Sequence, residues 1–215
     1  MKYAKELGES IFKNCAPAIM EFAEDEIDDL IQNQTFKNIP ILGTISSFIK
    51  IGKDFRERNL LRQTAIFYSE FTSRRISESK LREYRNKLKD DKKLIEELER
   101  ILILLDRNID DEKSRYIAKL YIACIENKIK WEEFCEFTDI TNRFYMEDYR
   151  ILRMLWDRRS RNQIKADDEF RVERIYSTGM VGINPATIGG GAHVVQGRKL
   201  NHMGKTYCDI IFSQE

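Results

Sequence analysis

Tyr176-Ser-Thr-Gly-Met-Val-Gly182, Gly189-Gly-Gly191 and Leu200-Asn-His-Met-Gly204 are the stretches of this chain that decide its fold. Seven of the ten glycines follow Thr178, whereas the sequence before them is dense in charge and nearly free of glycine. Clustered glycines supply turns and positive φ angles rather than helix interiors. The sequence therefore predicts a mostly α-helical protein, with an N-terminal multi-helix bundle over residues 1–130 and a small α+β module over residues 131–215.

The predicted module has a definite order of elements. Two helices lead to a third that ends at Gly179, a position suited to a left-handed helix cap. Met180–Ile183 is predicted as a short strand, Val194–Val195 with Lys199–Leu200 as the returning strand, and Met203–Phe212 as a final helix.

This order resembles winged-helix domains, in which a recognition helix is followed by a β-hairpin wing. Leu200-Asn-His-Met-Gly204 occupies the place of the Leu-Thr-x-x-Gly turn at which such a wing returns. Winged-helix modules bind proteins or nucleic acids. The candidate nucleic-acid contacts are Arg171, Arg174, Arg198 and Lys199. Carboxylates in the same helical segment would repel phosphate, which weakens the nucleic-acid interpretation.

Apolar residues at steps of three and four predict the helices of the bundle. They mark helices over residues 3–33 and 78–107, a core segment over 60–71, and further helices after Asp110, from Trp131, and over 147–157. Asp90-Asp91 is a candidate break in the charged helix. Within that helix, Glu96, Glu97, Glu99 and Arg100 are expected to pair along the outer surface.

Residues 39–58 read Ile39-Pro-Ile-Leu-Gly-Thr-Ile-Ser-Ser-Phe-Ile-Lys-Ile-Gly-Lys-Asp-Phe-Arg-Glu-Arg58. Pro40 fits the first turn of a helix. Two interpretations are open: an apolar stripe in the core, favoured because burial stabilises it, or a membrane or partner helix with a basic end that is released to anionic lipid. The apolar face is Ile41, Leu42, Ile45, Phe48 and Ile49, and the basic end is Lys50, Lys53, Arg56, Arg58 and Arg62.

A second basic group lies on the helix over 147–157 and in the candidate hinge that follows it, Arg158–Asp168. Arginine suits phosphate oxygens because of its planar fork of donors, so this group is a candidate phosphate, headgroup or nucleic-acid contact. The alternative is a set of cations at a helix C-terminus followed by a solvated loop. The group comprises Arg150, Arg153, Arg158, Arg159 and Arg161.

The sequence offers no pattern for catalysis. The four cysteines include no CxxC pair, His193 and His202 match no metal-ligand spacing, and no phosphate-loop lysine follows Gly189–Gly191. We therefore predict no catalytic residues, no metal, no cofactor and no enzymatic activity. Lys and Arg number 37 and Asp and Glu 36, which argues against a generic polyanion binder. No stretch reads as a signal peptide or a membrane span, so we expect a cytoplasmic protein that could also act at the inner face of the membrane.

Residues 39–58 resemble the start of the Abi-alpha-like proteins, a prokaryotic family linked to abortive infection and phage defence. Its members carry Ile-Pro-hydrophobic-x-Gly-Thr, then Lys-x-Gly and Arg-x-Arg, and a later Glu-Glu-Phe helix, which Glu132-Glu133-Phe134 matches. The resemblance covers residues 10–210 apart from the glycine-rich insert at 184–197.

The resemblance implies a non-enzymatic defence effector or accessory protein. Such a protein would act through a protein partner or self-association, and at anionic membrane surfaces. The alternative is a winged-helix regulator that binds nucleic acid.

Overall fold

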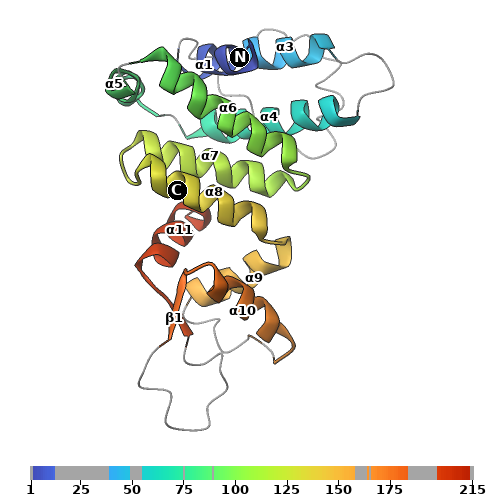
Figure 1. The fold of residues 1–215 in the computed structure, drawn as a ribbon, viewed down its shortest axis with the longest axis vertical. Coiled ribbons are helices and arrows are strands. Elements are labelled where there is room, and N and C mark those ends of the chain that lie inside the picture. Colours follow the sequence, from blue (N-terminus) through green and yellow to red (C-terminus); the bar gives the residue numbers. More distant parts are fainter. Residues whose placement is uncertain are drawn as a thin grey trace. The chain divides into compact units, whose positions relative to one another are not determined.

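The computed structural model describes residues 2–12, 39–48, 55–74, 76–88, 90–157, 164, 166–183 and 198–213. These residues are mostly α-helical and include one two-stranded sheet (Figure 1), which confirms the predicted fold class at this level. The chain forms two compact units, unit 1 over Met1–Thr138 and unit 2 over Asp139–Glu215. The boundary between the two units falls after Thr138, within the helix that begins at Trp131.

Unit 1 is built from helices alone among its described residues. Helix α4 packs against α3, α6 and α7, and α1 packs against α3 and α6 (Figure 1). The predicted break at Asp90 is confirmed, because Asp90 Oδ1 accepts a hydrogen bond of 2.8 Å from Lys92 N and caps α6. The helices are α1 (Lys2–Phe12), α3 (Pro40–Phe48), α4 (Phe55–Ser73), α5 (Glu78–Leu88), α6 (Asp91–Arg107), α7 (Asp111–Ile125) and the first turns of α8 (Trp131–Arg143).

The core of unit 1 is centred on Tyr121 of α7. Its ring lies 5.8–6.5 Å, between centroids, from the rings of Phe67, Phe71, Tyr84 and Phe134. Aromatic pairs at such distances contribute about 0.5–1.5 kcal/mol each beyond the area they bury. One tyrosine therefore joins α4, α5, α7 and α8.

Helix α3 belongs to this core. Ile41, Leu42 and Ile45 are all fully buried, and Ile41 N donates a 3.2 Å hydrogen bond to Ser10 Oγ of α1. The Phe48 side chain and Ile49 lie outside the described residues, as does most of the helix expected over 3–33. Among the helices that the structure describes, none combines the length and apolar composition that a membrane span needs.

Unit 2 contains the predicted hairpin. Strands β1 and β2 are antiparallel, with Val181 opposite Leu200 and Ile183 opposite Arg198. Gly179, with φ of +79°, stops the preceding helix as predicted. Val194–Val195 lies outside the described residues. After the last turn of α8, the elements are α9 (Met146–Trp156), a 3-10 helix η3 (Ala166–Asp168), α10 (Glu169–Ser177), β1 (Val181–Ile183), β2 (Arg198–Leu200) and α11 (His202–Phe212).

Asn201 and Gly204 fix the start of α11 against the end of α10. Asn201 Oδ1 accepts a 2.9 Å hydrogen bond from Gly204 N, and Asn201 N donates one of 3.0 Å to Met180 O. A Cβ at Gly204 would lie 2.3 Å from Met180 O and 2.9 Å from a methyl group of Leu200. The backbone at residue 204 therefore approaches Met180 and Leu200 so closely that only glycine, which lacks a Cβ, fits there.

We expect Gly204→Ala to lower the free energy of unfolding by about 1–3 kcal/mol, because the added methyl group would push the Met180 backbone aside. The usual helical gain of Ala over Gly, about 1 kcal/mol, offsets only part of this loss. Urea denaturation measures the difference.

Gly182→Ala is the matched control, because a Cβ at Gly182 meets nothing within 4 Å. It should change stability little or raise it slightly. Equal effects of the two substitutions would contradict the packing described for α11.

Candidate functional site

Two arginines of the predicted basic end are engaged within unit 1. Arg56 Nε donates to both carboxylate oxygens of Asp106 at 3.0 and 3.1 Å. Arg62 binds Asp111 through Nε at 3.0 Å and Nη2 at 2.6 Å. The hydrogen bond to Asp106 raises the pKa of Arg56 further. Both cations thus fasten the first turns of α4 to the end of α6 and the start of α7.

A buried polar network continues this contact. Ser114 Oγ donates to Gln63 Oε1 at 2.6 Å and accepts from Asn108 Nδ2 at 3.0 Å. Gln63 Nε2 donates to Asp111 Oδ1 at 3.0 Å. Because the buried polar groups satisfy one another, the network has the character of a structural joint. Of the other predicted cations, Arg58 is exposed, and Lys50 and Lys53 lie outside the described residues.

Glu97 lies inside unit 1, so the prediction that it pairs on the outer surface is wrong. Its side chain faces the core, where Tyr84 Oη donates to Glu97 Oε2 at 2.9 Å and lies 3.5 Å from Cys124 Sγ. Burial raises the pKa of Glu97 to about 7 and that of Cys124 to about 11. Tyr121 Oη, also buried, has no hydrogen-bond partner among the described residues. The Glu97 carboxyl is therefore a titratable group enclosed by aromatic side chains.

Glu97 should make unit 1 less stable at alkaline pH. Its folded-state pKa of about 7 exceeds the ordinary value of 4.5. Its contribution is therefore fully present below pH 4.5 and is lost as the pH rises through 7. The loss is of order 3 kcal/mol at 1.4 kcal/mol per pKa unit.

We expect Glu97→Gln to remove this pH dependence, as measured by urea denaturation between pH 5 and 8. Glu96→Gln, at the exposed neighbouring position, is the control and should leave the wild-type slope unchanged. A wild-type chain whose stability rises with pH across this window would contradict the assignment.

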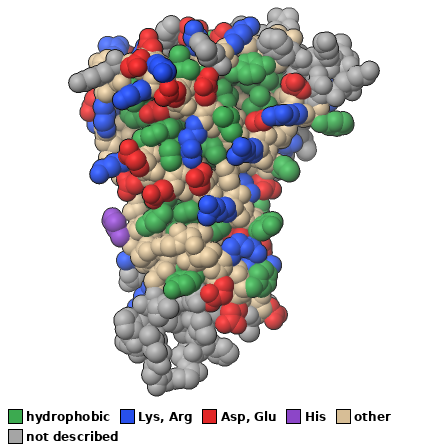
Figure 2. Space-filling model, viewed as in Figure 1, with side chains coloured by type: hydrophobic (Ala, Val, Ile, Leu, Met, Phe, Trp, Pro, Cys, Tyr) green, Lys and Arg blue, Asp and Glu red, His purple; other side chains and the backbone are tan. Residues whose placement is uncertain are grey.

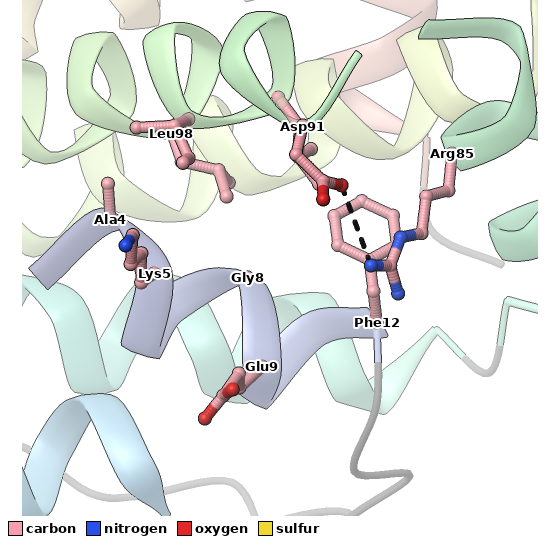
Figure 3. Close-up of a pocket in the computed structure, with 10 residues that line it drawn as sticks. Ala4, Lys5, Gly8, Glu9, Phe12, Arg85, Asp91 and Leu98 are labelled. Carbon is pink, nitrogen blue, oxygen red and sulfur yellow. Dashed lines mark ion pairs between the residues drawn. The ribbon is translucent and has the colours of Figure 1, made fainter. Parts of the chain in front are cut away.

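A cleft of about 290 Å³ lies between α1, α5 and α6 (Figure 3). Arg85 and Asp91 face each other across its end, with 3.7 Å between the charged atoms, and the Phe12 ring lies beside them. Lys5 and Glu9 add one charge of each sign, so the cleft has no net charge with which to select an ionic ligand. It is lined by Ala4, Lys5, Gly8, Glu9, Phe12, Arg85, Asp91, Leu94, Ile95 and Leu98. Its volume is at the small end for ligand pockets.

Unit 2 carries a stack of arginine and aromatic side chains, which we call the α10 stack: Tyr145, Phe170, Arg171 and Arg174. The Arg174 guanidinium lies 4.7 Å from the Tyr145 ring centroid and 5.7 Å from that of Phe170. The Arg171 guanidinium lies 4.4 Å from the Phe170 centroid. Tyr145 is 66% exposed and Phe170 55%. The stack therefore presents two large aromatic rings to solvent in fixed positions.

Two buried carboxylates hold the α10 stack. Asp148, which is fully buried, accepts hydrogen bonds of 2.8 Å from Arg174 Nη1 and of 2.8 Å from Tyr145 N. Asp168 accepts from Arg171 Nη1 at 3.0 Å and from Arg150 Nη2 at 2.9 Å. Charge-assisted hydrogen bonds of this kind fix the guanidinium planes, so the geometry of the stack is pre-organised.

The structure brings together only some of the predicted cations. Arg171 and Arg174 share the α10 stack, and Lys199 is exposed on β2. Arg150 also pairs with Glu147, which raises its pKa. The Arg153 guanidinium lies 4.5 Å from the Phe212 ring centroid. Four more of the predicted cations, Arg158, Arg159, Arg161 and Arg198, have side chains that lie outside the described residues.

Sequence reasoning missed the aromatic half of the stack and its buried anchor, Asp148. Tyr145 and Phe170 stand at the starts of α9 and α10, next to charged residues and away from the apolar stripes. The signal that could have found it is an aromatic residue in such a position with an arginine four residues later on the same helix, as with Phe170 and Arg174.

No metal-binding group of three or more His, Cys, Asp or Glu side chains occurs in the part of the chain that the structure describes. On the face drawn in Figure 2, acidic and basic side chains are interspersed rather than gathered by sign. No known protein family, curated protein or solved structure matches the chain. Its candidate functions therefore depend on its own geometry.

Proposed function

We propose that this protein is a non-enzymatic effector or accessory protein of phage defence that acts through protein contacts at the α10 stack. The observation that carries the proposal is the pair of exposed aromatic rings, Tyr145 and Phe170, which lie against arginines anchored on buried carboxylates. Aromatic and arginine side chains are the residues that dominate protein–protein binding energy. The defence role extends the resemblance of residues 39–58 to the Abi-alpha-like family, which stays a prediction.

We further propose that unit 2 is a winged-helix-like module, with α10 in the place of the recognition helix and β1–β2 as the wing. The element order and the antiparallel pairing of β1 with β2 support this proposal. In this arrangement the α10 stack lies on the element that winged-helix proteins use for recognition.

Nucleic-acid binding by unit 2 has less support than protein binding. Arg171 and Arg174 each share a hydrogen bond with a carboxylate, Asp168 or Asp148. An arginine that is already neutralised contributes little of the counterion release that drives binding to phosphate backbones.

The stack proposal can be tested in bacteria that express the chain, with plaque counts over a panel of phages. We expect the wild type to reduce plaque formation and the double variant Tyr145→Ala with Phe170→Ala to lose that effect. Truncating a binding hot spot costs about 2 kcal/mol or more, which is roughly 30-fold in Kd.

Tyr176→Ala is the control, because Tyr176 is also an exposed aromatic residue on α10 but lies outside the stack. It should protect like the wild type. A wild type that protects against no phage would end the defence proposal. A double variant that is folded and fully protective would instead rule out the α10 stack as the contact.

We also propose peripheral contact with anionic membranes, and the observation behind this second proposal lies in unit 1. The apolar edge of unit 1 consists of Phe55, Ile103 and Ile109, which are 88%, 52% and 85% exposed. Phe55 precedes Arg56, whose guanidinium binds Asp106, and Asp106 lies one helical turn after Ile103. The Ile109 carbonyl accepts a 3.2 Å hydrogen bond from Gln63 of the same α4 helix.

Exposed cations flank this edge. Arg58 and Arg107 are exposed and form no ion pair with another described residue. Exposed apolar side chains beside cations suit the headgroup layer of an anionic membrane. We therefore assign peripheral membrane contact to this edge and leave the buried residues of α3 in the core.

Vesicle flotation tests the assignment. The chain should float with phosphatidylserine-containing vesicles, less so at high salt, and should not float with phosphatidylcholine alone. Phe55→Asp should abolish flotation without unfolding the protein, whereas Tyr176→Asp should leave it unchanged. Ile45→Asp should unfold unit 1, because it places a charge in the core. A folded Ile45→Asp variant that no longer floats would instead favour insertion of α3.

A further inference from the structure

The cleft between α1, α5 and α6 has an apolar floor (Figure 3). On the α1 side the floor consists of Ala4 and Gly8, which lie one turn apart and leave room because neither has a large side chain. On the α6 side it consists of Leu94, Ile95 and Leu98. Water inside such a cleft finds few hydrogen-bonding partners, so an aliphatic group that displaces it gains free energy.

The end of the cleft carries two opposite charges that are only loosely paired. The Arg85 Nη2 atom lies 3.7 Å from Asp91 Oδ1, and the two side chains are 40% and 84% exposed. A contact of this length is not a hydrogen bond, and a pair so exposed contributes about 0–1 kcal/mol. A ligand can therefore replace this contact at little cost and use the guanidinium donors and the carboxylate acceptors itself.

The charges on the cleft balance. Lys5 and Glu9 of α1 add one cation and one anion to those of Arg85 and Asp91. A ligand with a single charge would be attracted by one member of the Arg85–Asp91 pair and repelled by the other. A zwitterion meets both favourably, because its carboxylate accepts from the guanidinium while its ammonium group donates to the carboxylate.

The size of the cleft narrows the class of ligand further. Its volume of about 290 Å³ lies at the lower limit for ligand pockets. The volume suits a compact molecule in which an apolar group of a few carbons adjoins the two charges. The charged end of the cleft and its apolar floor provide for these two parts separately.

We propose that this cleft is a binding site for a small zwitterion with an apolar side chain, of the class of the aliphatic α-amino acids. The ligand carboxylate pairs with Arg85, its ammonium group pairs with Asp91, and its side chain lies on Ile95 and Leu98. The site lies wholly in unit 1. It is independent of the α10 stack and of the function proposed for that stack, so the phage assay and the experiments on this cleft can fail separately.

Thermal unfolding of the full chain tests the site. L-Leucine should raise Tm in a saturable way, by about 3–6 °C at a tenfold excess over Kd. Isocaproate and isoamylamine keep the alkyl group of leucine but carry only one of its charges, and glycine carries both charges without the side chain. All three should raise Tm far less. A shift with isocaproate or isoamylamine as large as that with leucine, or no shift with leucine, would overturn the proposal.

Variants of the charged pair locate the binding. Arg85→Gln should weaken leucine binding about tenfold or more, as measured by calorimetry, because it removes the charged hydrogen-bond donors. Arg82→Gln is the matched control, since Arg82 lies on the same helix but pairs with Glu78 outside the cleft. Asp91→Asn is the second variant, and Asp90 still caps α6 in it. Leucine binding that is unchanged in both folded variants would contradict the assignment to this cleft.

Discussion

The pairing of Asp148 with Arg174 is the interaction on which unit 2 depends. A carboxylate that is fully buried must be neutralised and hydrogen-bonded, because its desolvation would otherwise cost several kcal/mol. Asp148 meets this requirement by accepting from Tyr145 N at the start of α9 and from Arg174 of α10. The two helices are thereby fixed, and the rings of Tyr145 and Phe170 are left outside against the guanidinium planes. The exposed stack is a consequence of how the buried charge is satisfied.

In unit 1, arginines pair with single carboxylates at the start of α4 and share one carboxylate at Glu70. Arg56 and Arg62 each bind one carboxylate bidentately, so the charges at the start of α4 cancel in pairs. Around Glu70 one carboxylate is shared: Arg74 Nε donates to Glu70 Oε1 at 2.9 Å, and Arg115 and Lys119 lie within ion-pair distance of the same carboxylate.

Local signals in the sequence predicted the helices and the hairpin well. Glycine at 179 and the Asp90-Asp91 break act through backbone conformation and capping, which depend only on near neighbours. The partners of the arginines could not be predicted in this way, since Arg56 reaches Asp106 and Arg174 reaches Asp148, 50 and 26 residues away. The prediction that Glu97 pairs on the surface was wrong for a related reason. Charge spacing along α6 suggested surface pairs, but Tyr84 on α5 supplies a buried donor.

The neutralised arginines also bear on what kind of partner fits unit 2. A basic recognition helix attracts nucleic acid because its cations are free to replace counterions on phosphate. The arginines of α10 are already paired with the carboxylates of Asp168 and Asp148. The surface that remains exposed is aromatic and edged by guanidinium groups. Such a surface gains free energy by burying its rings against apolar or aromatic groups and by donating the remaining guanidinium hydrogens to carbonyl oxygens. Those are the groups that a protein surface offers, so the same pairing that holds unit 2 together supports the proposal that its partner is a protein.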